Sequence, residues 1–422
     1  MNYSLSLQYM TIVELPYGKT KINIDIPAKN FGQKILPSEP SHLDQESEIL
    51  KEALLNPTNS KPLKDIVSSS SKIAILVSDA TRSCPTEKLL QPLLNLLYEY
   101  GIKDHQITIV FGLGLHRKQT IDEMKYIVGN NVYSKIKCIE HDRFKCRYVG
   151  TTKIGTPVEV FEEVLDSDTI ICTGNIELHY YAGYSGGAKA ILPGVSSEKS
   201  IISNHKLMIH ENATIGNIMS PVRMDMEDAV NFVNVDFLYN VIVDSHKNIV
   251  AATAGNVIDA HRKGVSIVDK MYKVEVEPAD IVVVSAGGYP KDINLYQAQK
   301  ALENAKGAVK DGGSIIIVAE CTDGFGNTTF EKWNRELKTP EDVITKFNQE
   351  FELGGHKAAF VAKLSKRSKL YLSSDLPEMD VKSAFCIPSK SIQEQLNDLL
   401  AKNPNAIVHV MPFGGLTLTT PK

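Results

Sequence analysis

The sequence predicts an α/β protein of two Rossmann-like domains, each with a mostly parallel sheet, and with a cleft between the domains. The first observation is a recurring unit: a short β-branched run, a polar or glycine-rich loop, and usually a helical stretch. Strands buried on both faces read as continuous apolar runs, so these runs are typical of a parallel sheet covered by helices. The second observation is the length of 422 residues, which favours two domains.

The elements follow in chain order. Residues 11–27 alternate apolar and polar side chains around Tyr17–Gly18, which predicts a β-hairpin. A connecting helix completes the first sixty or so residues. Strands of the parallel sheets are expected at residues 72–80, 106–114, 168–175, 280–288, 313–321, 370–375 and 406–412.

Two helices are well marked. Residues 85–101 carry leucines at helical spacing and end at Gly101, a residue type favoured just past a helix end. A second helix begins after Asp292 or Asn294, either of which suits the N-cap. Its packed stripe is expected to consist of Leu295, Ala298, Leu302 and Ala305.

The domain boundary is placed near residues 270–278, so the N-terminal domain spans 1–272 and the C-terminal domain 273–422. A return of the extreme C-terminus onto the N-terminal domain is left open. The chain shows no low-complexity segment and no repeat beyond the β-α rhythm.

The net charge of −4 offers no electrostatic footprint for nucleic acid. The sequence has no apolar run long enough to cross a membrane, and its start does not read as a signal peptide. The six cysteines are scattered without a C-x-x-C pair, which favours buried free thiols in a reducing compartment. The cytoplasm is therefore the expected location.

Charged and polar residues recur where the predicted strands end. In open α/β sheets, ligands bind beyond the carboxyl ends of the strands. The residues found there include Asp79 and Arg82, His116, His179 and Lys189, and Gln297 and Lys300. Their repetition at strand ends predicts a binding cleft.

Each of these signals has an ordinary structural alternative. Asp79 and Arg82 suit carboxylate binding, but also a helix cap beside a solvated arginine. His116 ends "FGLGLH" and suits general acid/base work or a structural hydrogen bond. The dinucleotide fingerprint G-x-G-x-x-G is absent there. Gln297 and Lys300 share one helix face, which either looks into the cleft or is solvated.

The stretch "HYYAGYSGGAKAILPG", from His179 to Gly194, is the most unusual. Ser185, Gly186 and Gly187 suit a nest of backbone N–H groups that binds an anion. Lys189 then neutralises a phosphate or acts as a nucleophile that carries a cofactor, unless the loop is only a tight turn with an incidental lysine. His205, after a predicted helix, is a candidate for one imidazole ligand of a metal, although its spacing from His179 fits no structural zinc motif.

Together, "SDATR", "GLGLHR", "HYYAGYSGGAKAILPG", "SNH" and "GGYPKDINLYQAQK" resemble the lactate racemase family of nickel-dependent 2-hydroxyacid racemases and epimerases. The motifs occur in the family's order over residues 72–320. The resemblance implies a nickel-pincer nucleotide, a pyridinium-3,5-bisthiocarboxylic acid mononucleotide type of cofactor, together with cofactor-synthesis proteins that load it.

The resemblance also implies a role for each candidate residue. Lys189 would attach the cofactor covalently and His205 would ligate nickel. His116 and His179 would act as acid and base on the substrate hydroxyl. The remaining assignments are cofactor binding by Ser185, Gly186, Gly187 and Tyr296, and substrate binding by Asp79, Arg82, Gln297, Lys300 and His356.

The implied chemistry avoids a carbanion. Hydride leaves the substrate Cα for the cofactor, a flat 2-oxo acid forms, and hydride returns to the other face. The family's pocket tryptophan aligns with "LGGHKAAF", where His356 takes its place. Malate or another polar 2-hydroxy acid is then an alternative to lactate. An NAD-dependent 2-hydroxyacid dehydrogenase and a non-catalytic anion- or cofactor-binding protein are the competing functions.

Overall fold

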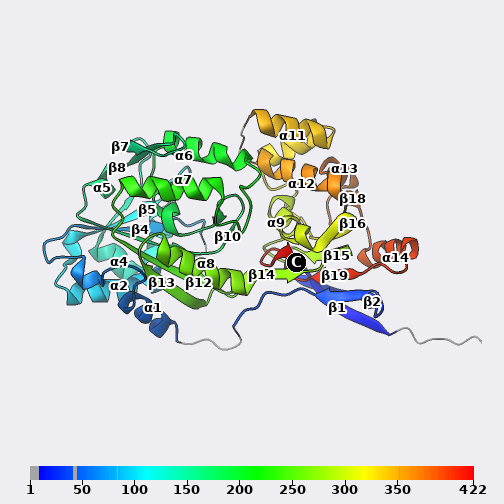
Figure 1. The fold of residues 1–422 in the computed structure, drawn as a ribbon, viewed down its shortest axis with the longest axis horizontal. Coiled ribbons are helices and arrows are strands. Elements are labelled where there is room, and N and C mark those ends of the chain that lie inside the picture. Colours follow the sequence, from blue (N-terminus) through cyan, green and yellow to red (C-terminus); the bar gives the residue numbers. More distant parts are fainter. Residues whose placement is uncertain (1–8, 41–44, 83, 351, 353) are drawn as a thin grey trace, which may run out of the picture. The chain divides into compact units, whose positions relative to one another are not determined.

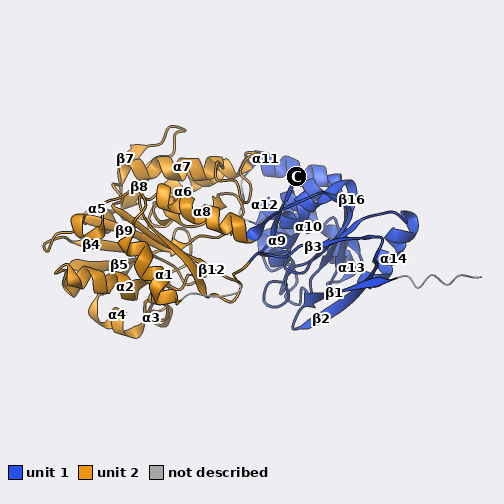
Figure 2. Ribbon diagram, turned by 60° about the horizontal axis from the view of Figure 1, so that its bottom comes forward, with its two compact units in different colours: residues 1–38, 272–422 blue, residues 39–271 orange. Residues whose placement is uncertain are grey.

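The computed structural model describes residues 9–40, 45–82, 84–350, 352 and 354–422 (Figure 1). The chain forms two compact units. Unit 1 combines Met1–Ser38 with Tyr272–Lys422, and unit 2 spans Glu39–Met271 (Figure 2). The division at Met271 lies beside the boundary that the sequence predicts.

The N-terminal hairpin belongs to unit 1, although the sequence analysis assigned residues 1–272 to one domain. The hairpin itself forms as predicted, from β1 (Met10–Tyr17) and β2 (Thr20–Pro27). Its apolar side chains enter the unit 1 core, and β3 (Phe31–Lys34) pairs with a strand near the C-terminus. Long-range sheet pairing of this kind leaves no local sequence signal, so the assignment of residues 10–38 is corrected here.

The extreme C-terminus also stays in unit 1. Strand β20 (Leu418–Pro421) pairs in parallel with β14 (Lys273–Val276), at the start of the C-terminal segment.

Unit 2 contains a six-stranded sheet in the order β13-β12-β9-β4-β5-β6. Its strands are parallel except for the edge pair β12–β13. Three predicted strands are confirmed as β4, β5 and β9, whereas the edge hairpin was not predicted. The bounds are β4 (Ile73–Ser78), β5 (Ile107–Gly112), β6 (Lys137–Glu140), β9 (Thr169–Asn175), β12 (Phe237–Val243) and β13 (Ile249–Gly255); the small hairpins are β7 (Cys146–Thr151) with β8 (Pro157–Phe161) and β10 (Leu178–His179) with β11 (Gly183–Tyr184).

Helices cover both faces of this sheet (Figure 1). Alternate residues Ile73, Ile75 and Val77 of β4 pack in one cluster with the leucines of α1 and α2. The predicted helix at 85–101 is α2, and its leucine stripe is buried. The helices are α1 (Glu46–Leu55), α2 (Thr86–Glu99), α3 (Ile121–Val128), α4 (Asn130–Lys135), α5 (Glu162–Leu165), α6 (Glu198–His205), α7 (Pro221–Ala229) and α8 (Asp259–Tyr272).

Unit 1 has a second six-stranded sheet, in the order β18-β17-β16-β15-β19-β3, and all its pairings are parallel. The four predicted strands of this region are confirmed. The bounds are β15 (Ala279–Ser285), β16 (Val309–Val318), β17 (Lys369–Ser373), β18 (Ile387–Pro388) and β19 (Val408–Met411). The structure thus has two mostly parallel sheets with helices, which confirms the predicted α/β fold class.

Helix α9 (Leu295–Ala305) begins at Asn294, whose side chain accepts the N–H of Gln297. Asn294 is thus the cap among the two predicted candidates. The predicted stripe of Leu295, Ala298, Leu302 and Ala305 is buried. The other helices of unit 1 are α10 (Thr328–Glu336), α11 (Pro340–Gln349), α12 (Gly355–Arg367), α13 (Glu378–Ser383) and α14 (Ile392–Lys402).

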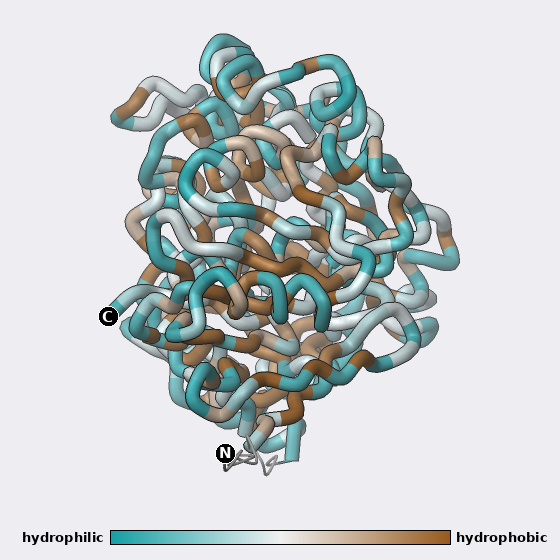
Figure 3. The backbone as a smooth tube through the Cα atoms, turned by 90° about the vertical axis from the view of Figure 1, so that its right-hand side faces the viewer, coloured by the Kyte–Doolittle hydropathy of each residue, from teal (hydrophilic) through white to brown (hydrophobic). Residues whose placement is uncertain are grey.

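Hydrophobic stretches run through the interior of the chain trace, and the outer turns are mainly hydrophilic (Figure 3). None of the helices in the described part of the chain has the length and apolar character that crossing a membrane requires. All six cysteines are free, as predicted, but the predicted burial holds only for Cys172, Cys321 and Cys386. The other three are partly exposed.

Candidate active site

The carboxyl ends of β9, β4 and β5 meet at one edge of the unit 2 sheet because these three strands are adjacent and parallel. The segment after β4 carries Asp79 and Arg82. The segment after β5 carries His116, and the one after β9 carries the glycine loop with Lys189. The predicted gathering of these residues at strand ends is therefore observed.

Asp79 and His116 form a close pair. Nδ1 of His116 lies 3.0 Å from Oδ2 of Asp79, and the backbone N–H of Thr81 donates to Oδ1 at 2.7 Å. Burial alone would raise the pKa of Asp79, but hydrogen bonds from His116 and Thr81 outweigh it and lower this pKa to about 2. The carboxylate is thus charged, and it orients the imidazole by accepting a hydrogen bond from Nδ1–H.

Arg82 adds a positive charge at the rim of this cluster. Its Nε lies 3.9 Å from Oδ2 of Asp79, and its side chain is 43% exposed. The charge of Arg82 also contributes to lowering the pKa values of His179, Lys189 and His205, after burial. Arg82 therefore links the aspartate–histidine pair with the residues of the glycine loop.

Lys189 and His179 are in direct contact. Nζ of Lys189 lies 2.8 Å from Nε2 of His179, and Nδ1 of the same ring accepts the N–H of Ala182 at 3.3 Å. A neutral imidazole that accepts at Nδ1 carries its proton on Nε2, where it faces the lysine nitrogen. Burial holds the pKa of Lys189 well below its usual range, and the charges of Arg82 and Arg223 lower it further. Burial therefore favours the neutral amine of Lys189, the form that acts as a nucleophile.

Tyr181 lies between the two histidines of the loop region. Its hydroxyl is 3.0 Å from Nε2 of His205, and its ring contacts the rings of His179 and His205 edge-on at centroid distances of 4.6 and 5.3 Å. Burial is the main cause that lowers the pKa of His205 to about 3. The imidazole is thus neutral, as metal ligation requires. His205 is the last residue of α6, whereas the sequence analysis placed it after the helix.

The glycine loop does not offer the full anion nest that its sequence predicts. The N–H of Ser185 donates to the carbonyl of Glu177, and the N–H of Gly187 donates to Oδ1 of Asn240. These two amides already have acceptors within the chain. Gly186 and Gly187 have φ of 71° and 59°, and a Cβ on Gly187 would lie 2.7 Å from the ring of His261. Their role here is to permit a positive φ and close packing.

Sequence reasoning missed the residues that support this loop. Arg223 is fully buried and donates to the carbonyls of Ala182, Tyr184 and Gly186. On the other side of the loop, Nε2 of His261 donates to the carbonyl of Ser185 at 2.8 Å. No sequence signal identifies these residues, because they come from α7 and α8, well separated from the loop along the chain.

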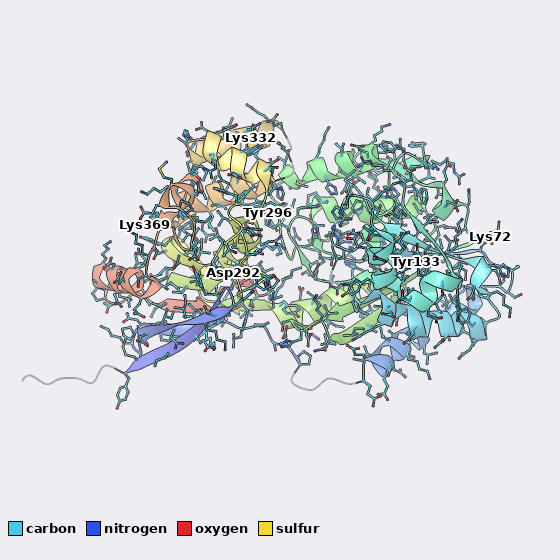
Figure 4. All side chains as sticks on the ribbon, turned by 180° about the vertical axis from the view of Figure 1, so that it is seen from behind. Lys72, Tyr133, Asp292, Tyr296, Lys332 and Lys369 are labelled. Atoms are coloured by element: carbon cyan, nitrogen blue, oxygen red, sulfur yellow. The ribbon has the colours of Figure 1, made fainter. Side chains whose placement is uncertain are left out.

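The predicted residues of unit 1 cluster at the start of α9, where Figure 4 labels Asp292 and Tyr296. Gln297 is half-buried and Lys300 is exposed, so both lie away from the packed stripe. Asp292 is fully buried, and its Oδ2 accepts the N–H of Gly18 at 2.6 Å. That contact ties the hairpin turn to the segment before α9.

His356 and Lys357 lie in the first turn of α12 and are both 4% exposed. Nδ1 of His356 accepts the N–H of Gly354 at 3.1 Å. Nζ of Lys357 donates to the carbonyl of Tyr296 and lies 3.8 Å from the centre of its ring. Burial lowers the pKa of Lys357 well below its usual range, and the charge of Lys300 lowers it further. Lys357, which the sequence analysis did not name, thus joins α12 to α9.

Trp333 packs beside this segment without entering the polar cluster. A Cβ on Gly355 would lie 2.6 Å from the indole, whose Nε1 donates to Oε2 of Glu352 at 2.8 Å. The ring is 1% exposed. Trp333 belongs to α10 and His356 to α12, and the place of His356 in the substrate pocket stays a prediction.

Within the described residues, no group of three or more histidine, cysteine, aspartate or glutamate side chains is arranged to hold a metal ion. A metal bound at His205 would take its remaining ligands from a bound cofactor or from solvent. The fit to a covalently attached, metal-carrying cofactor rests on the neutral amine of Lys189 and the neutral imidazole of His205, which both contact Tyr181.

Comparisons with known proteins identify the family of the chain. The model of the lactate racemase N-terminal domain matches residues 17–216, and that of the lactate racemase C-terminal domain matches residues 274–412. The chain is 35% identical to the lactate racemase of Thermoanaerobacterium thermosaccharolyticum, over 96% of this chain and 98% of the relative. It is 30% identical to the lactate racemase of Lactiplantibacillus plantarum, over 79% and 81% of the two chains.

Solved structures show the same fold. The lactate racemase apoprotein of T. thermosaccharolyticum superposes with a TM-score of 0.88 at 33% identity, covering 97% of this chain and all of the other. A protein from Thermotoga maritima shares the fold, with a TM-score of 0.63 at 19% identity, over 90% of this chain and all of the other. With both domain models and nearly its whole length matched, the chain is an isomerase that belongs to the lactate racemase family.

Proposed function

We propose that this protein is a nickel-pincer-dependent racemase or epimerase of a 2-hydroxy acid. The observation that carries the proposal is the contact of 2.8 Å between the amine of Lys189 and His179, in a cluster that also contains Tyr181 and His205. A buried neutral lysine beside a neutral histidine is suited to covalent cofactor attachment. The names of the two lactate racemase relatives support the reaction class.

Lys189 would hold the pyridinium nucleotide and His205 would supply the protein ligand to nickel. When bound, this group supplies a hydride acceptor and donor for the substrate Cα. The remaining tasks fall to the chain itself: binding the carboxylate, moving the hydroxyl proton and excluding water. Tyr296 is retained as a proposed cofactor contact, although it belongs to the other unit.

The two histidines are suited to complementary proton transfers. Asp79 is charged and accepts a hydrogen bond from Nδ1–H of His116, so Nε2 of that ring is the proton acceptor. His179 accepts at Nδ1 from Ala182 and therefore carries its proton on Nε2. In the proposed reaction, His116 takes the hydroxyl proton from one enantiomer and His179 returns a proton to the other, and the reverse reaction exchanges their roles.

Substrate positioning is assigned to cationic and amide groups. Arg82 has an exposed guanidinium that is not fully used by Asp79 at 3.9 Å. An arginine fork binds a carboxylate in two-point fashion, so it holds the acid group while the Cα becomes planar. We propose that Gln297 and Lys300, which belong to unit 1, act on the same substrate.

The substrate is proposed to be lactate or a more polar 2-hydroxy acid. Nδ1 of His356 accepts a backbone N–H, so its neutral ring is a donor at Nε2. Lys357 lies next to it, and its pKa responds to the charge of Lys300. Two nearby lysines favour a substrate with a second anionic group, since that group would relieve their mutual repulsion. Malate has this chemistry.

Co-expression of the chain with the cofactor-synthesis proteins tests the proposal. The purified protein is assayed for racemisation of a panel of chiral 2-hydroxy acids, with chiral chromatography as the readout. The proposal requires interconversion of enantiomers without added NAD. Turnover that depends on NAD, followed by its absorbance change, would indicate the dehydrogenase, and a loaded protein without turnover would indicate a binding protein.

A further inference from the structure

Helix α7 carries three buried charged side chains at alternate positions. Arg223, Asp225 and Glu227 are 0, 2 and 5% exposed. Burial of charged groups costs free energy unless they are paired and hydrogen-bonded, and apolar replacements are often at least as stable. Three such groups on one nine-residue helix therefore call for an explanation beyond stability.

The start of α7 holds the glycine loop. Arg223 donates from Nε to the carbonyl of Ala182 at 3.4 Å, from Nη1 to that of Gly186 at 3.1 Å, and from Nη2 to that of Tyr184. Ser220, the residue before the helix, donates to the carbonyl of Tyr181. Four carbonyls of the loop that carries Lys189 are thus held from one helix end.

The hydrogen bond from Arg223 to Ala182 is connected to His179 through the backbone of Ala182. Its carbonyl accepts from Arg223, and its N–H donates to Nδ1 of His179. The same ring contacts Lys189 through Nε2. Any relaxation at Arg223 should therefore move the imidazole of His179.

The middle of α7 holds the helix that ends in His205. Asp225 accepts from Nδ2 of Asn204 at 2.9 Å, and from the hydroxyls of Thr152 and Thr156 at 2.5 and 2.7 Å. Asn204 precedes His205 in α6 and also donates to the carbonyl of Val222. The position of His205 thus depends on a second charged residue of the same helix.

The end of α7 anchors the helix itself. Oε2 of Glu227 accepts from Nη2 of Arg262 in α8 at 2.6 Å. Glu227 also stabilises the charge of Arg223, which burial would otherwise disfavour. This pair fixes α7 against α8. Helix α7 can therefore act as one rigid support for both the glycine loop and α6.

We infer that helix α7 is the positioning element of the site, in which Arg223 sets the loop with His179 and Lys189 while Asp225 sets His205. The inference rests on the proposed function for its catalytic meaning, but it concerns geometry that exists in the cofactor-free chain. Arg223 and Asp225 are positioning residues, because each acts through another side chain.

The test uses long-range ¹H–¹⁵N spectra of histidine side chains in the cofactor-free protein at one fixed pH. Signals are assigned with His179→Gln and His205→Gln. We expect Arg223→Gln to displace the His179 signals and Asp225→Asn to displace the His205 signals. Loaded enzyme carrying either change should lose roughly 10–100-fold in turnover, as for other residues that orient ligands from behind.

Glu303→Gln is the matched control. Glu303 is 4% exposed and pairs with Lys306 in unit 1, so this change removes a buried carboxylate that is distant in the chain from His179 and His205. It should lower the melting temperature and leave both sets of signals as in wild type. If the two α7 variants also lower only the melting temperature, the helix serves stability alone and the inference is overturned.

Two milder variants cover a failure to fold. Arg223→Lys keeps the charge but replaces the fork by a single ammonium, and Thr156→Val removes one donor to Asp225. Displaced signals of His179 and His205, respectively, support the inference, and wild-type signals overturn it. Since the spectra need no cofactor, an inactive loaded wild type would count against the proposed function and leave this inference standing.

Discussion

The amine of Lys189 lies 2.8 Å from Nε2 of His179, while the backbone N–H of Ala182 donates to the other nitrogen of that ring. This relationship places the imidazole proton on the nitrogen that faces the lysine, whose pKa is lowered by burial first and then by the charges of Arg82 and Arg223. A lysine prepared in this way is poised to form a covalent bond rather than an ion pair. The first prediction follows from it.

Lys189 is expected to carry the cofactor. Protein co-expressed with the cofactor-synthesis enzymes should show an added mass that maps to a peptide containing Lys189. Lys189→Ala should lose this adduct, because no other amine occupies the position beside His179. Lys206→Ala, which removes an exposed lysine of the same region, is the control and should keep it. Full cofactor retention by active Lys189→Ala would contradict covalent attachment.

His205 is expected to bind nickel, whereas His116 and His179 are not. His205→Ala should lose the metal, measured by elemental analysis of the loaded protein. His116→Ala and His179→Ala should keep it and lose turnover by about 10²-fold or more, the usual scale for general acid/base groups.

The exposed His210 provides the control for these three variants, and His210→Ala should keep both metal and turnover. Equal metal loss in the variants of His116, His179 and His205 would mean that the roles are divided wrongly.

Acid should weaken the fold through Asp79. The pKa of its carboxyl is lowered to about 2 in the folded protein, so its contribution to stability is present above the unfolded value near 3.8. That contribution is lost as the pH falls through 2, and it amounts to about 2 kcal/mol for a buried carboxyl. In urea unfolding, the stability gap between wild type and Asp79→Asn should narrow between pH 5 and pH 3. A gap that stays constant over this range would contradict the pairing with His116.

A polar 2-hydroxy acid is expected to exceed lactate in kcat/KM. If His356 lines the wall that faces the substrate's C3, the methyl of lactate offers its ring no hydrogen-bond partner, whereas a charged polar group does. A hydrogen bond to a charged group contributes about 1.5–3 kcal/mol, which corresponds to roughly tenfold to hundredfold in kcat/KM. His356→Trp should narrow or reverse the difference.

Lys357→Met tests the role of the second lysine in this prediction. It nearly keeps the length of the side chain and removes the amine that donates to the carbonyl of Tyr296, so it should slow a dicarboxylic substrate more than lactate. Wild-type protein that prefers lactate over every polar acid tested would show that neither residue selects the substrate.

The sequence by itself determined the α/β class, the main strands of both parallel sheets and the family. Buried parallel strands read as continuous apolar runs. The end of each run located the loop that follows the strand. Asp79, His116 and Lys189 could be named because the carboxyl ends of adjacent parallel strands must share an edge. The N-cap at Asn294 and the buried stripe of α9 could also be predicted, because both depend on local sequence. The cap needs one side-chain oxygen, and the stripe follows from helical spacing.

Tertiary structure alone decided which partners those residues meet. The glycine loop reads as an anion nest, yet Asn240 takes the N–H of Gly187, and Arg223 takes three loop carbonyls from α7. Arg223 and Glu227 are four residues apart, a spacing that is equally typical of an ion pair on the exposed face of a helix. The local sequence therefore could not predict that both side chains are buried. The hairpin of residues 10–27 joined unit 1 for the same reason. Pairing and packing between distant segments depend on the whole fold, whereas periodicity reports only on the turn or strand that contains it.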